Sequence, residues 1–460
     1  MVTVREPVGD VARIWGEGKP QKTEEYRLIR YLLRQEADGK TVLCHTVTGE
    51  VAELGDAEAD LLGTLPGAYR EEMDDLIAHR FLVPADFDEH REVLSLRRAI
   101  KLFQKAKPTS SYVILPTTGC NARCFYCFEA GTEVVTMTPE AADKTADYIL
   151  SHLPEDKKVH ILWFGGEPTV ASRRIDRICR KLTENGVELA SEMISNAYLF
   201  DEEMADRARD LWKLYRIQIT LDGTEETYNR VKAYVNPTDN PYRRVLRNIS
   251  LLLDRGVHVS LRMNLDRYNF EEIKALIAEL KEHFSGNPLF GAYAFPLNDN
   301  CGWTSHTEED IVWQDEKVIE LGELIDQAGL SIRGEKFTPP ALRVNGCMAD
   351  SGTSVGINPK GELVLCMEKF EKDAVVGTIE DGVTDPGNLR AWSETFEYPE
   401  CAECAHYPRC VRLKKCPGTI RCRESWKKKY YDKFLVVYYR KWRLEQTTTH
   451  SVTNTQEKEN

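Results

Sequence analysis

Three cysteines lie close together just beyond the first quarter of the chain. They form the run Cys120-Asn-Ala-Arg-Cys124-Phe-Tyr-Cys127, a Cys-x3-Cys-x2-Cys triplet. Three thiolates on one short loop can ligate three irons of a cubane [4Fe–4S] cluster, whose usual set is four thiolates. The fourth iron then keeps an open position for a substrate or cofactor. The alternative is a chance spacing, of which about 0.01 would be expected in a chain of this cysteine content.

A second group of cysteines lies in the last quarter of the chain. Its spacing is Cys-x13-Gly-x4-Cys followed by Cys-x2-Cys-x5-Cys-x5-Cys-x5-Cys, and its members are Cys347, Cys366, Cys401, Cys404, Cys410, Cys416 and Cys422. In a reducing compartment, clustered thiols indicate metal ligation rather than disulfides. Zinc is the alternative for Cys401 and Cys404, although seven cysteines exceed one zinc site. Cys44 and Cys179 match no pattern, and we predict that they are packed thiols.

The composition is that of a globular protein with several domains. The 460 residues carry 61 Lys and Arg against 74 Asp and Glu, a net charge of −13, which argues against general nucleic-acid binding. The mean hydropathy is −0.44, and no apolar stretch is long enough for a transmembrane helix. Because the first residues also lack an apolar signal region, we expect a cytoplasmic protein without a membrane partner.

The first cysteine triplet follows a strand in a long run of alternating elements. Six strand-like segments are separated by helix-like ones: Tyr112–Pro116, Val159–Phe164, Glu192–Ser195, Arg216–Leu221, His258–Asn264 and Leu289–Phe295. Six β/α repeats predict an α/β fold with a parallel, barrel-like sheet, a partial (β/α)6 barrel. Such folds carry their chemistry on loops at the C-terminal ends of strands, where the triplet lies.

Smaller units flank the predicted barrel. In chain order we predict a flexible lead-in (1–24), a small α+β domain of three strands followed by helices (25–93), a linking helix (94–109), the barrel (110–300), a bridging segment (301–340), a cysteine-rich domain with a C-terminal helix (341–444) and a disordered tail (445–460). Asp38-Gly39 predicts a hairpin turn in the small domain. The basic helix at Arg423–Arg443 either packs on the cysteine-rich domain through Phe434, Leu435 and Tyr438 or grips an acidic peptide through Lys427, Lys428 and Lys429.

The triplet, in the loop after the first barrel strand, resembles the signature of the radical S-adenosylmethionine (SAM) superfamily. The resemblance implies that the open iron binds SAM and that an electron from the cluster releases a 5′-deoxyadenosyl radical, which abstracts a hydrogen atom. The run Phe164-Gly165-Gly166-Glu167-Pro168 follows the second strand, where the family has its GGEP motif. The glycines would let the backbone approach the SAM amino group, and Glu167 would accept from the ammonium. Taken alone, this run would be an ordinary turn.

Further positions correspond to SAM contacts of the family. They are Phe125 and Tyr126 in the triplet, Ser195 and Asn196 after the third strand, Thr220 and Asp222 after the fourth, and Arg230 beyond it. The resemblance places the Ser-Asn pair near the SAM ribose and likens Thr220-Leu221-Asp222-Gly223 to the family's Ser-x-Asp-Gly stretch. Arg230 would pair with the SAM carboxylate. Turn roles for Asn196 and Asp222, and a solvated charge for Arg230, are the alternatives.

The second cysteine group resembles the SPASM domain, which carries two auxiliary [4Fe–4S] clusters, so the resemblance implies three clusters in all. Five residues rather than three separate Cys410 from Cys416. Carried over by position, one cluster takes Cys401, Cys404, Cys410 and Cys422, and the other takes Cys347, Cys366 and Cys416. Relatives that ligate the latter cluster fully have an extra cysteine shortly after the first one, and residues 348–354 contain none. The implied open iron would bind a substrate thiolate, unless Cys301 or an oxygen ligand fills the position.

The resemblance as a whole implies a peptide maturase. SPASM enzymes mostly act on peptides or proteins, and the unit at 25–93 resembles, in element order, the winged RiPP recognition element, which binds the leader of a ribosomal precursor peptide as an added strand. A structural cap on the barrel is the alternative for this unit. We expect a thioether between a cysteine sulfur and a carbon of another residue, with a flavodoxin- or ferredoxin-type electron donor.

Three other activities stay open at this point. A carbon–carbon or carbon–oxygen cross-link is a near variant. An anaerobic sulfatase maturase would oxidise Cys or Ser to formylglycine, but such relatives tend to have Asp directly after the second cysteine of the Gly-x4-Cys motif, and Met367-Glu368 follows Cys366 here. A non-catalytic electron carrier would not need the GGEP-like turn.

Overall fold

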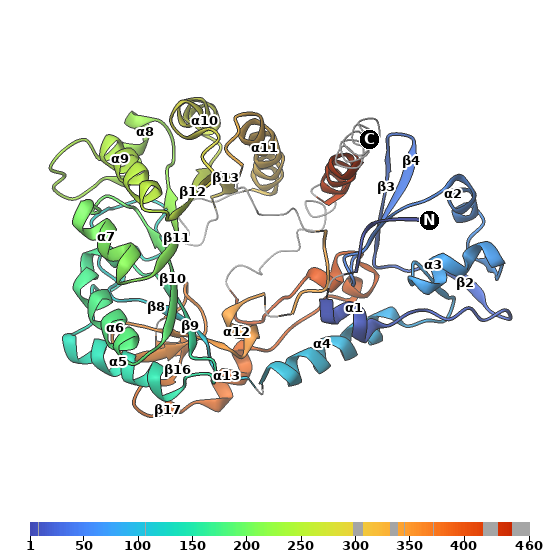
Figure 1. Cartoon of the computed structure of the whole chain (residues 1–460), viewed down its shortest axis with the longest axis horizontal. Coiled ribbons are helices and arrows are strands. Elements are labelled where there is room, and N and C mark those ends of the chain that lie inside the picture. Colours follow the sequence, from blue (N-terminus) through green and yellow to red (C-terminus); the bar gives the residue numbers. More distant parts are fainter. Residues whose placement is uncertain are drawn as a thin grey trace, which may run out of the picture.

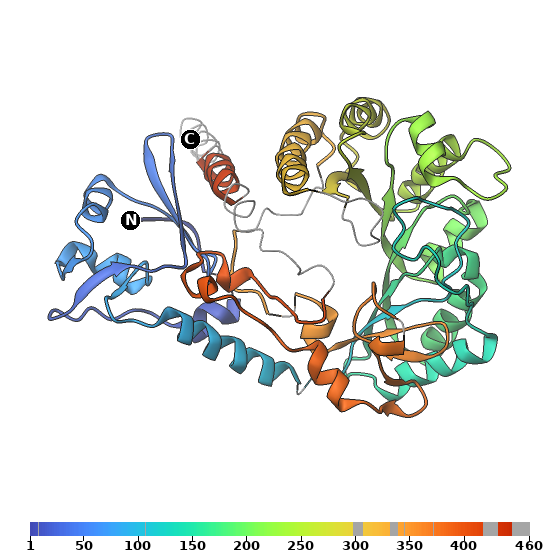
Figure 2. The ribbon, with the colours of Figure 1, turned by 180° about the vertical axis from the view of Figure 1, so that it is seen from behind.

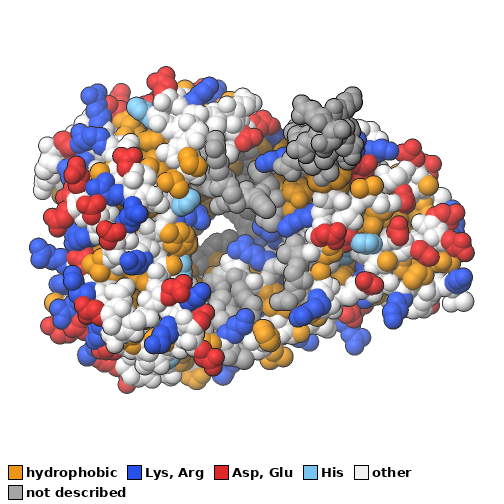
Figure 3. All heavy atoms as spheres, in the orientation of Figure 1, with side chains coloured by type: hydrophobic (Ala, Val, Ile, Leu, Met, Phe, Trp, Pro, Cys, Tyr) orange, Lys and Arg blue, Asp and Glu red, His pale blue; other side chains and the backbone are white. Residues whose placement is uncertain are grey.

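The computed structural model describes residues 1–7, 9–105, 107–297, 307–331, 339–344, 346–370, 372–416 and 431–443. A barrel-like α/β domain lies on the left in Figure 1 and a smaller N-terminal unit on the right. A long helix and the C-terminal part of the chain join the two. Figure 3 shows that the surface is hollowed at the centre, between the two halves.

Six parallel strands in chain order form the barrel sheet, as the sequence predicts: β8 (Ser111–Ile114), β9 (Lys158–Trp163), β10 (Glu188–Ser195), β11 (Leu214–Thr220), β12 (His258–Leu265) and β13 (Phe290–Pro296). Seven helices accompany these strands: α5 (Pro139–Ser151), α6 (Ser172–Glu184), α7 (Glu202–Asp210), α8 (Glu225–Lys232), α9 (Pro241–Asp254), α10 (Phe270–Phe284) and α11 (Glu308–Gln327). Alternate strand residues such as Trp163, Met193 and Ile217 are buried in the main apolar core. Their burial orients the other face of each strand toward the barrel interior.

The barrel sheet continues into the C-terminal part of the chain. Strand β14 (Ser354–Ile357) pairs in parallel with β8, and β15 (Glu362–Val364), β16 (Val375–Thr378) and β17 (Gly382–Val383) follow in antiparallel order. Short helices complete this part: α12 (Met348–Ser351), η3 (Lys372–Ala374), α13 (Pro386–Trp392), η4 (Pro399–Glu403) and η5 (Tyr407–Arg409). The segment from Cys347 to Cys366 is therefore built onto the barrel sheet rather than standing apart from it.

The N-terminal unit contains two small antiparallel sheets. The first has the order β1 (Val2–Arg5), β5 (Val51–Glu53), β4 (Lys40–His45), β3 (Leu32–Ala37), and the second has the order β6 (Gly67–Ala68), β2 (Glu25–Leu28), β7 (Leu82–Pro84). Its helices are α1 (Gly9–Trp15), α2 (Asp56–Leu62), η1 (Glu71–Met73) and α3 (Asp74–Ala78). Asp38 and Gly39 have φ of 51° and 76° and join β3 to β4, which is the predicted hairpin turn.

The prediction of a flexible lead-in at 1–24 is wrong for β1 and α1. Val4 is buried where β1 pairs with β5. Trp15 at the end of α1 is 7% exposed and meets the rings of His45 and Phe87 edge-on. Burial of these two apolar side chains fixes a segment whose polar composition alone suggests disorder.

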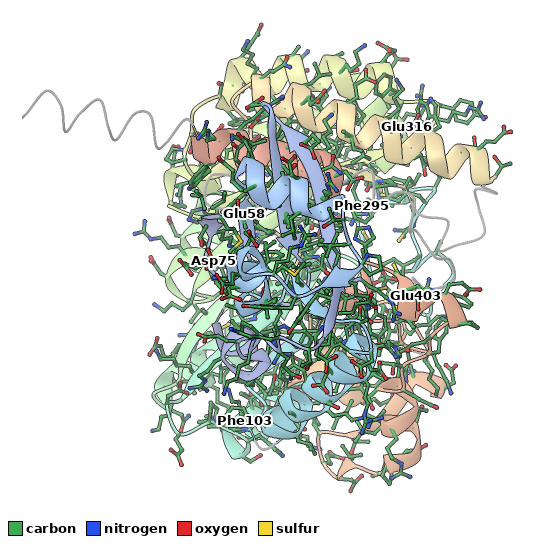
Figure 4. The ribbon with its side chains drawn as sticks, turned by 90° about the vertical axis from the view of Figure 1, so that its right-hand side faces the viewer. Glu58, Asp75, Phe103, Phe295, Glu316 and Glu403 are labelled. Atoms are coloured by element: carbon green, nitrogen blue, oxygen red, sulfur yellow. The ribbon has the colours of Figure 1, made fainter. Side chains whose placement is uncertain are left out.

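The long helix α4 (Glu89–Lys105) links the N-terminal unit to the barrel (Figure 1). It begins five residues before the predicted linker, because the Glu89 carboxylate is buried at its first turn, where it accepts from the Arg27 guanidinium at 2.8 Å. In Figure 4, Phe103 marks the lower end of this helix. Among the helices that the structure describes, none is both long and apolar enough to cross a membrane.

The C-terminal helix packs on the N-terminal unit as well as on the cysteine-rich part. Tyr431 at its start stacks on His406, as the prediction expects, but Leu435 packs on the N-terminal unit instead. Residues 431–443 are helical, and Figure 2 shows this helix beside β3 and β4. Leu435 and Tyr439 are fully buried against the first sheet, and the Tyr439 hydroxyl donates to Glu53 at 2.7 Å. Cys301, Cys422, Lys427, Lys428, Lys429 and the tail lie outside the described residues.

Candidate active site

The cysteine triplet lies in the loop that leaves β8. All three thiols are partly exposed. Burial raises the pKa of Cys120 to about 12, and the charges of Glu167, Cys124 and Cys127 add to the rise. Three thiols within electrostatic reach of one another are costly to ionise alone, and bound iron relieves that cost because it neutralises the thiolates. Three thiols on one short loop have the donor chemistry that a [4Fe–4S] cluster requires, although no three His, Cys, Asp or Glu side chains among the described residues are gathered at metal-binding spacing.

The Gly-Gly-Glu turn after β9 lies directly against this loop. Gly166 N–H donates to Thr117 O at 3.1 Å, and Glu167 N–H donates to Gly119 O at 2.9 Å. Gly165 has φ of +110°, and a Cβ there would lie 2.3 Å from Thr117 O. The two glycines therefore let the turn approach the backbone of the cluster loop, a role that the sequence analysis does not anticipate.

Glu167 joins the turn to the end of β10. Its side chain is 1% exposed, and its carboxylate accepts from Thr169 N–H at 3.0 Å and hydroxyl at 2.5 Å, from the Ser195 hydroxyl at 2.9 Å and from Asn196 N–H at 2.7 Å. Burial raises its pKa, against the effect of these donors. Pro168 then begins the short helix η2 (Pro168–Ala171).

We call the Gly-Gly-Glu turn and the Ser195-Asn196 pair, joined through the Glu167 carboxylate, the bracket. Asn196 connects the bracket to the cysteine loop. Its side-chain amide donates to Asn121 Oδ1 at 2.7 Å and lies 4.0 Å from the Cys120 sulfur. The Ser195-Asn196 pair and the Gly-Gly-Glu turn therefore meet at the loop of the first cysteine, on the strand ends where the sequence places the chemistry.

Asp222 lies at the centre of a buried polar network after β11. Its side chain is 2% exposed. One carboxylate oxygen accepts from the Tyr126 hydroxyl at 2.6 Å and lies 3.0 Å from the Lys232 ammonium, and the other accepts from Asn264 at 2.9 Å. Asp222 is thus tied to the triplet through Tyr126.

The remaining predicted cofactor contacts are more exposed. Phe125 is 45% exposed and meets the Tyr126 ring edge-on. Thr220 ends β11 and is half-buried. Arg230 is exposed, and its guanidinium lies 3.4 Å from the Thr227 hydroxyl, apart from the buried Asp222 network.

Sequence reasoning misses three polar residues of this region. Lys232 and Asn264 complete the Asp222 network. Glu129, two residues after Cys127, is 8% exposed and has no hydrogen-bond partner among the described residues. Burial raises the pKa of Glu129 to about 7. Its place directly after the triplet is the one signal that points to it.

A cation on β12 adjoins this network through Asn264. Arg262 on β12 donates to Asn264 at 2.8 Å and lies over the Phe295 ring, 4.1 Å from its centroid; Figure 4 labels Phe295. Burial raises the pKa of Glu368, and the charge of Arg262 opposes that rise. Glu368 follows Cys366 by two residues, so the charge of Arg262 acts on a carboxylate next to one of the C-terminal cysteines.

The described C-terminal cysteines form two sets by mutual electrostatic reach. Apart from burial, the pKa of Cys347 is raised by Cys416, and Cys347 in turn contributes to the rise of the Cys366 pKa to about 11. In the other set Cys410 contributes to the raised pKa of Cys401. The assignment of these cysteines to two clusters stays a prediction, and Cys422 lies outside the described residues.

The two sets adjoin a common cavity of about 240 Å³. Its lining includes Cys347, Cys410 and Cys416 together with basic side chains such as Arg409. Cys404 lies one turn from Cys401, with its N–H donating to Cys401 O at 3.2 Å. Cys44 and Cys179 are fully buried, which confirms the prediction that they are packed thiols.

Comparisons with known proteins agree with this site. Residues 114–280 match the model of the radical SAM superfamily, so this part of the chain is a radical SAM domain. A domain of this class implies a [4Fe–4S] cluster and SAM. No curated protein matches the chain.

Solved structures share the fold at low sequence identity. Native anSMEcpe with bound AdoMet is 16% identical, with a TM-score of 0.56 over 71% of this chain and 98% of that chain. Streptococcus suis SuiB bound to S-adenosylmethionine is 17% identical, with a TM-score of 0.51 over 86% of this chain and 99% of that chain. SuiB bound to precursor peptide SuiA is 14% identical, with a TM-score of 0.50 over 87% and 99% of the two chains. The chain therefore shares its fold with these three structures.

Proposed function

We propose that this protein is a radical SAM peptide maturase that joins a cysteine sulfur of a ribosomal precursor peptide to a carbon of another residue as a thioether. The observation that carries the proposal is that Cys347 and Cys366 lie on the segment that extends the barrel sheet, and that Cys416 lines the same cavity as Cys347. A metal held by these three thiolates would keep an open position on the side of the chain that is built onto the barrel.

The residues of the chain have distinct roles toward the cofactors. Cys120, Cys124 and Cys127 would hold the SAM cluster. When bound, the clusters supply the electron that cleaves SAM into methionine and a 5′-deoxyadenosyl radical and accept one electron when the product forms. The Glu167 carboxylate ties the Gly-Gly-Glu turn to the end of β10, while Glu167 N–H and the Asn196 amide hold both against the cluster loop through Gly119 O at 2.9 Å and Asn121 Oδ1 at 2.7 Å. The bracket would hold in place the backbone against which SAM binds.

The reaction balances with these groups. The carbon of the substrate loses a hydrogen atom to the deoxyadenosyl radical, the cysteine thiol loses a proton, and the carbon–sulfur bond forms as one electron leaves. The sequence offers one acidic side chain within residues 348–354 as an oxygen ligand, Asp350. In the structure Asp350 is buried and forms an ion pair with Lys101 of α4. Because the Asp350 carboxylate is paired with Lys101, it does not serve as the oxygen ligand of the cluster. This supports an iron with an open position for the substrate thiolate.

The N-terminal unit would bind the leader of the peptide. Its first sheet presents β3 as an outer strand, which suits addition of a peptide strand. Arg30 beside this sheet pairs with Glu403 of η4 at 2.9 Å, and Figure 4 labels Glu403 at this junction. The unit is thus tied to the cysteine-rich part, across the central hollow from the radical site.

The proposal is tested with a precursor peptide encoded near the gene, SAM and a reductant under anaerobic conditions. We expect a product that has lost two hydrogens and one free thiol, with fragmentation that maps a sulfur–carbon bond. Cys366→Ala should still cleave SAM but form no cross-link, and Cys44→Ala, a buried thiol of the N-terminal sheet, is the matched control. A product that keeps all its thiols would contradict the thioether and indicate a carbon–carbon or carbon–oxygen link, whereas formylglycine would identify a sulfatase-maturase reaction.

A further inference from the structure

A buried cation lies beside the second cysteine of the triplet. Lys232 at the end of α8 is 4% exposed, and its ammonium lies 3.0 Å from Asp222 Oδ2 and 2.8 Å from the Tyr126 hydroxyl oxygen. It also lies over the rings of Tyr126 and Tyr228, 5.5 and 5.8 Å from their centroids. A buried lysine stays charged only where such partners surround it. The radical SAM assignment does not by itself explain why a cation is placed here.

Lys232 lies against the cysteine loop. Its ammonium lies 2.8 Å from the hydroxyl oxygen of Tyr126, two residues after Cys124. Tyr126 donates its single hydroxyl proton to Asp222 at 2.6 Å. The positive charge held beside the loop is therefore that of the Lys232 ammonium, which also acts on the Cys124 sulfur.

The backbone fixes Lys232 relative to the cysteine loop. Arg123 N–H donates to Lys232 O at 2.8 Å, and Val235 N–H donates to Asn121 O at 2.8 Å. Between these two contacts, Ala233 has a φ of 43°, the left-handed conformation that ends α8. The segment that carries the cation and the loop that carries the thiols are thus held as one piece, and the distance between charge and sulfur is built into the fold.

We propose that Lys232 is a positioning residue that raises the reduction potential of the cluster held by Cys120, Cys124 and Cys127. A fixed positive charge beside a ligand sulfur stabilises the reduced cluster, which is the more negative form, because charge and hydrogen bonding around the sulfurs set the potential. Burial strengthens the effect, since little water lies between charge and sulfur to screen it. The proposal concerns this cluster alone and is independent of the peptide reaction.

The test measures the midpoint reduction potential of the SAM-binding cluster in the reconstituted full chain. The EPR signal of this reduced cluster is identified because it changes when SAM is added, and that signal is followed through a redox titration. Lys232→Met should shift the potential to more negative values, and Asp222→Asn should shift it to more positive values. The double variant Lys232→Met/Asp222→Asn leaves no unpaired buried charge, and its potential should lie between those of the two single variants, because their shifts oppose each other. Lys232→Arg should stay close to the wild type.

A matched control separates charge from structure. Arg207→Met breaks an ion pair that is only partly buried, Arg207 with Asp176 at 2.6 Å, in the outer helix layer and should leave the potential unchanged. A purely structural role for Lys232 would loosen the site and move the potentials of the Lys232 and Asp222 variants in the same direction. Shifts of the same sign in both single variants, or no shift in either, would overturn the proposal.

Discussion

Replacing Gly166 with alanine should force apart the two segments that form the candidate site. The added Cβ would lie 2.5 Å from the carbonyl oxygens of Thr118 and Gly119, which is 3.0 − 2.5 = 0.5 Å inside the limit that real Cβ contacts keep. Both contacts are with backbone atoms, so no side-chain rotation relieves them. The turn has to move away from the cluster loop.

The size of the effect follows from these contacts. Overpacking of this kind costs about 1–3 kcal/mol, and the movement weakens the hydrogen bonds of Gly166 N–H and Glu167 N–H to the cluster loop, each worth about 1 kcal/mol. We expect the free energy of unfolding to fall by about 2–4 kcal/mol. The rate of SAM cleavage should fall roughly 100-fold, since displacements of the order of an ångström cost that much in catalysis.

The assay combines urea unfolding of the cluster-free protein with the rate of 5′-deoxyadenosine formation by the reconstituted protein. Gly322→Ala in α11 is the control for Gly166→Ala, because nothing lies within 4 Å of its Cβ. Gly165→Ala is paired with Gly256→Ala: both positions have positive φ, but only the first meets backbone, at 2.3 Å. If Gly166→Ala behaves like Gly322→Ala in both measurements, the bracket does not position the site.

Four further changes have defined outcomes. Burial lowers the pKa of His45 to about 3. Below about pH 6.5 His45 is therefore protonated in the unfolded chain but stays neutral in the folded chain. Because of this difference, the unfolding free energy should fall by about 1.4 kcal/mol for each pH unit below 6.5. His45→Leu should flatten this slope in urea titrations at pH 4.5–6.5, and an unchanged slope would contradict the assignment. Leu435→Ala should cost about 2–5 kcal/mol in unfolding free energy, since Leu435 is fully buried against the first sheet; a neutral result would mean that the C-terminal helix is not docked there. Glu167→Gln should cost about 1–3 kcal/mol in the same assay, because an amide cannot accept from all the donors that surround the carboxylate, and an unchanged midpoint would refute the bracket. Cys366→Ala should lower the iron content after reconstitution while Cys44→Ala leaves it unchanged, and equal iron in both would remove Cys366 from the ligands.

The barrel could be predicted because its signal is local and repeated. Each of its strands is an apolar run of the right length between helical segments, and the parallel order follows from the repeats. β1 and the packing of the C-terminal helix could not be predicted in this way. β1 has only four residues, and its place beside β5 depends on tertiary pairing. Leu435 and Tyr439 mark an apolar face without indicating which surface covers it.

The candidate site divides along the same line. The cysteine triplet and the Gly-Gly-Glu turn stand out because residue type and spacing together are rare. Lys232 lies in the last turn of an amphipathic helix, where a lysine ordinarily faces water. Only the fold brings it to Asp222 and to Cys124. Cys124 lies 108 positions earlier in the sequence (232 − 124).

The central claim is that the triplet holds a cluster that cleaves SAM. It is tested most directly by iron content and 5′-deoxyadenosine formation after anaerobic reconstitution, compared between the wild type and the Cys120→Ala/Cys124→Ala/Cys127→Ala variant. Three clusters of four irons predict about twelve irons in the wild type, about eight in the variant, and loss of SAM cleavage in the variant. A variant that keeps all its iron and still forms 5′-deoxyadenosine would contradict the account.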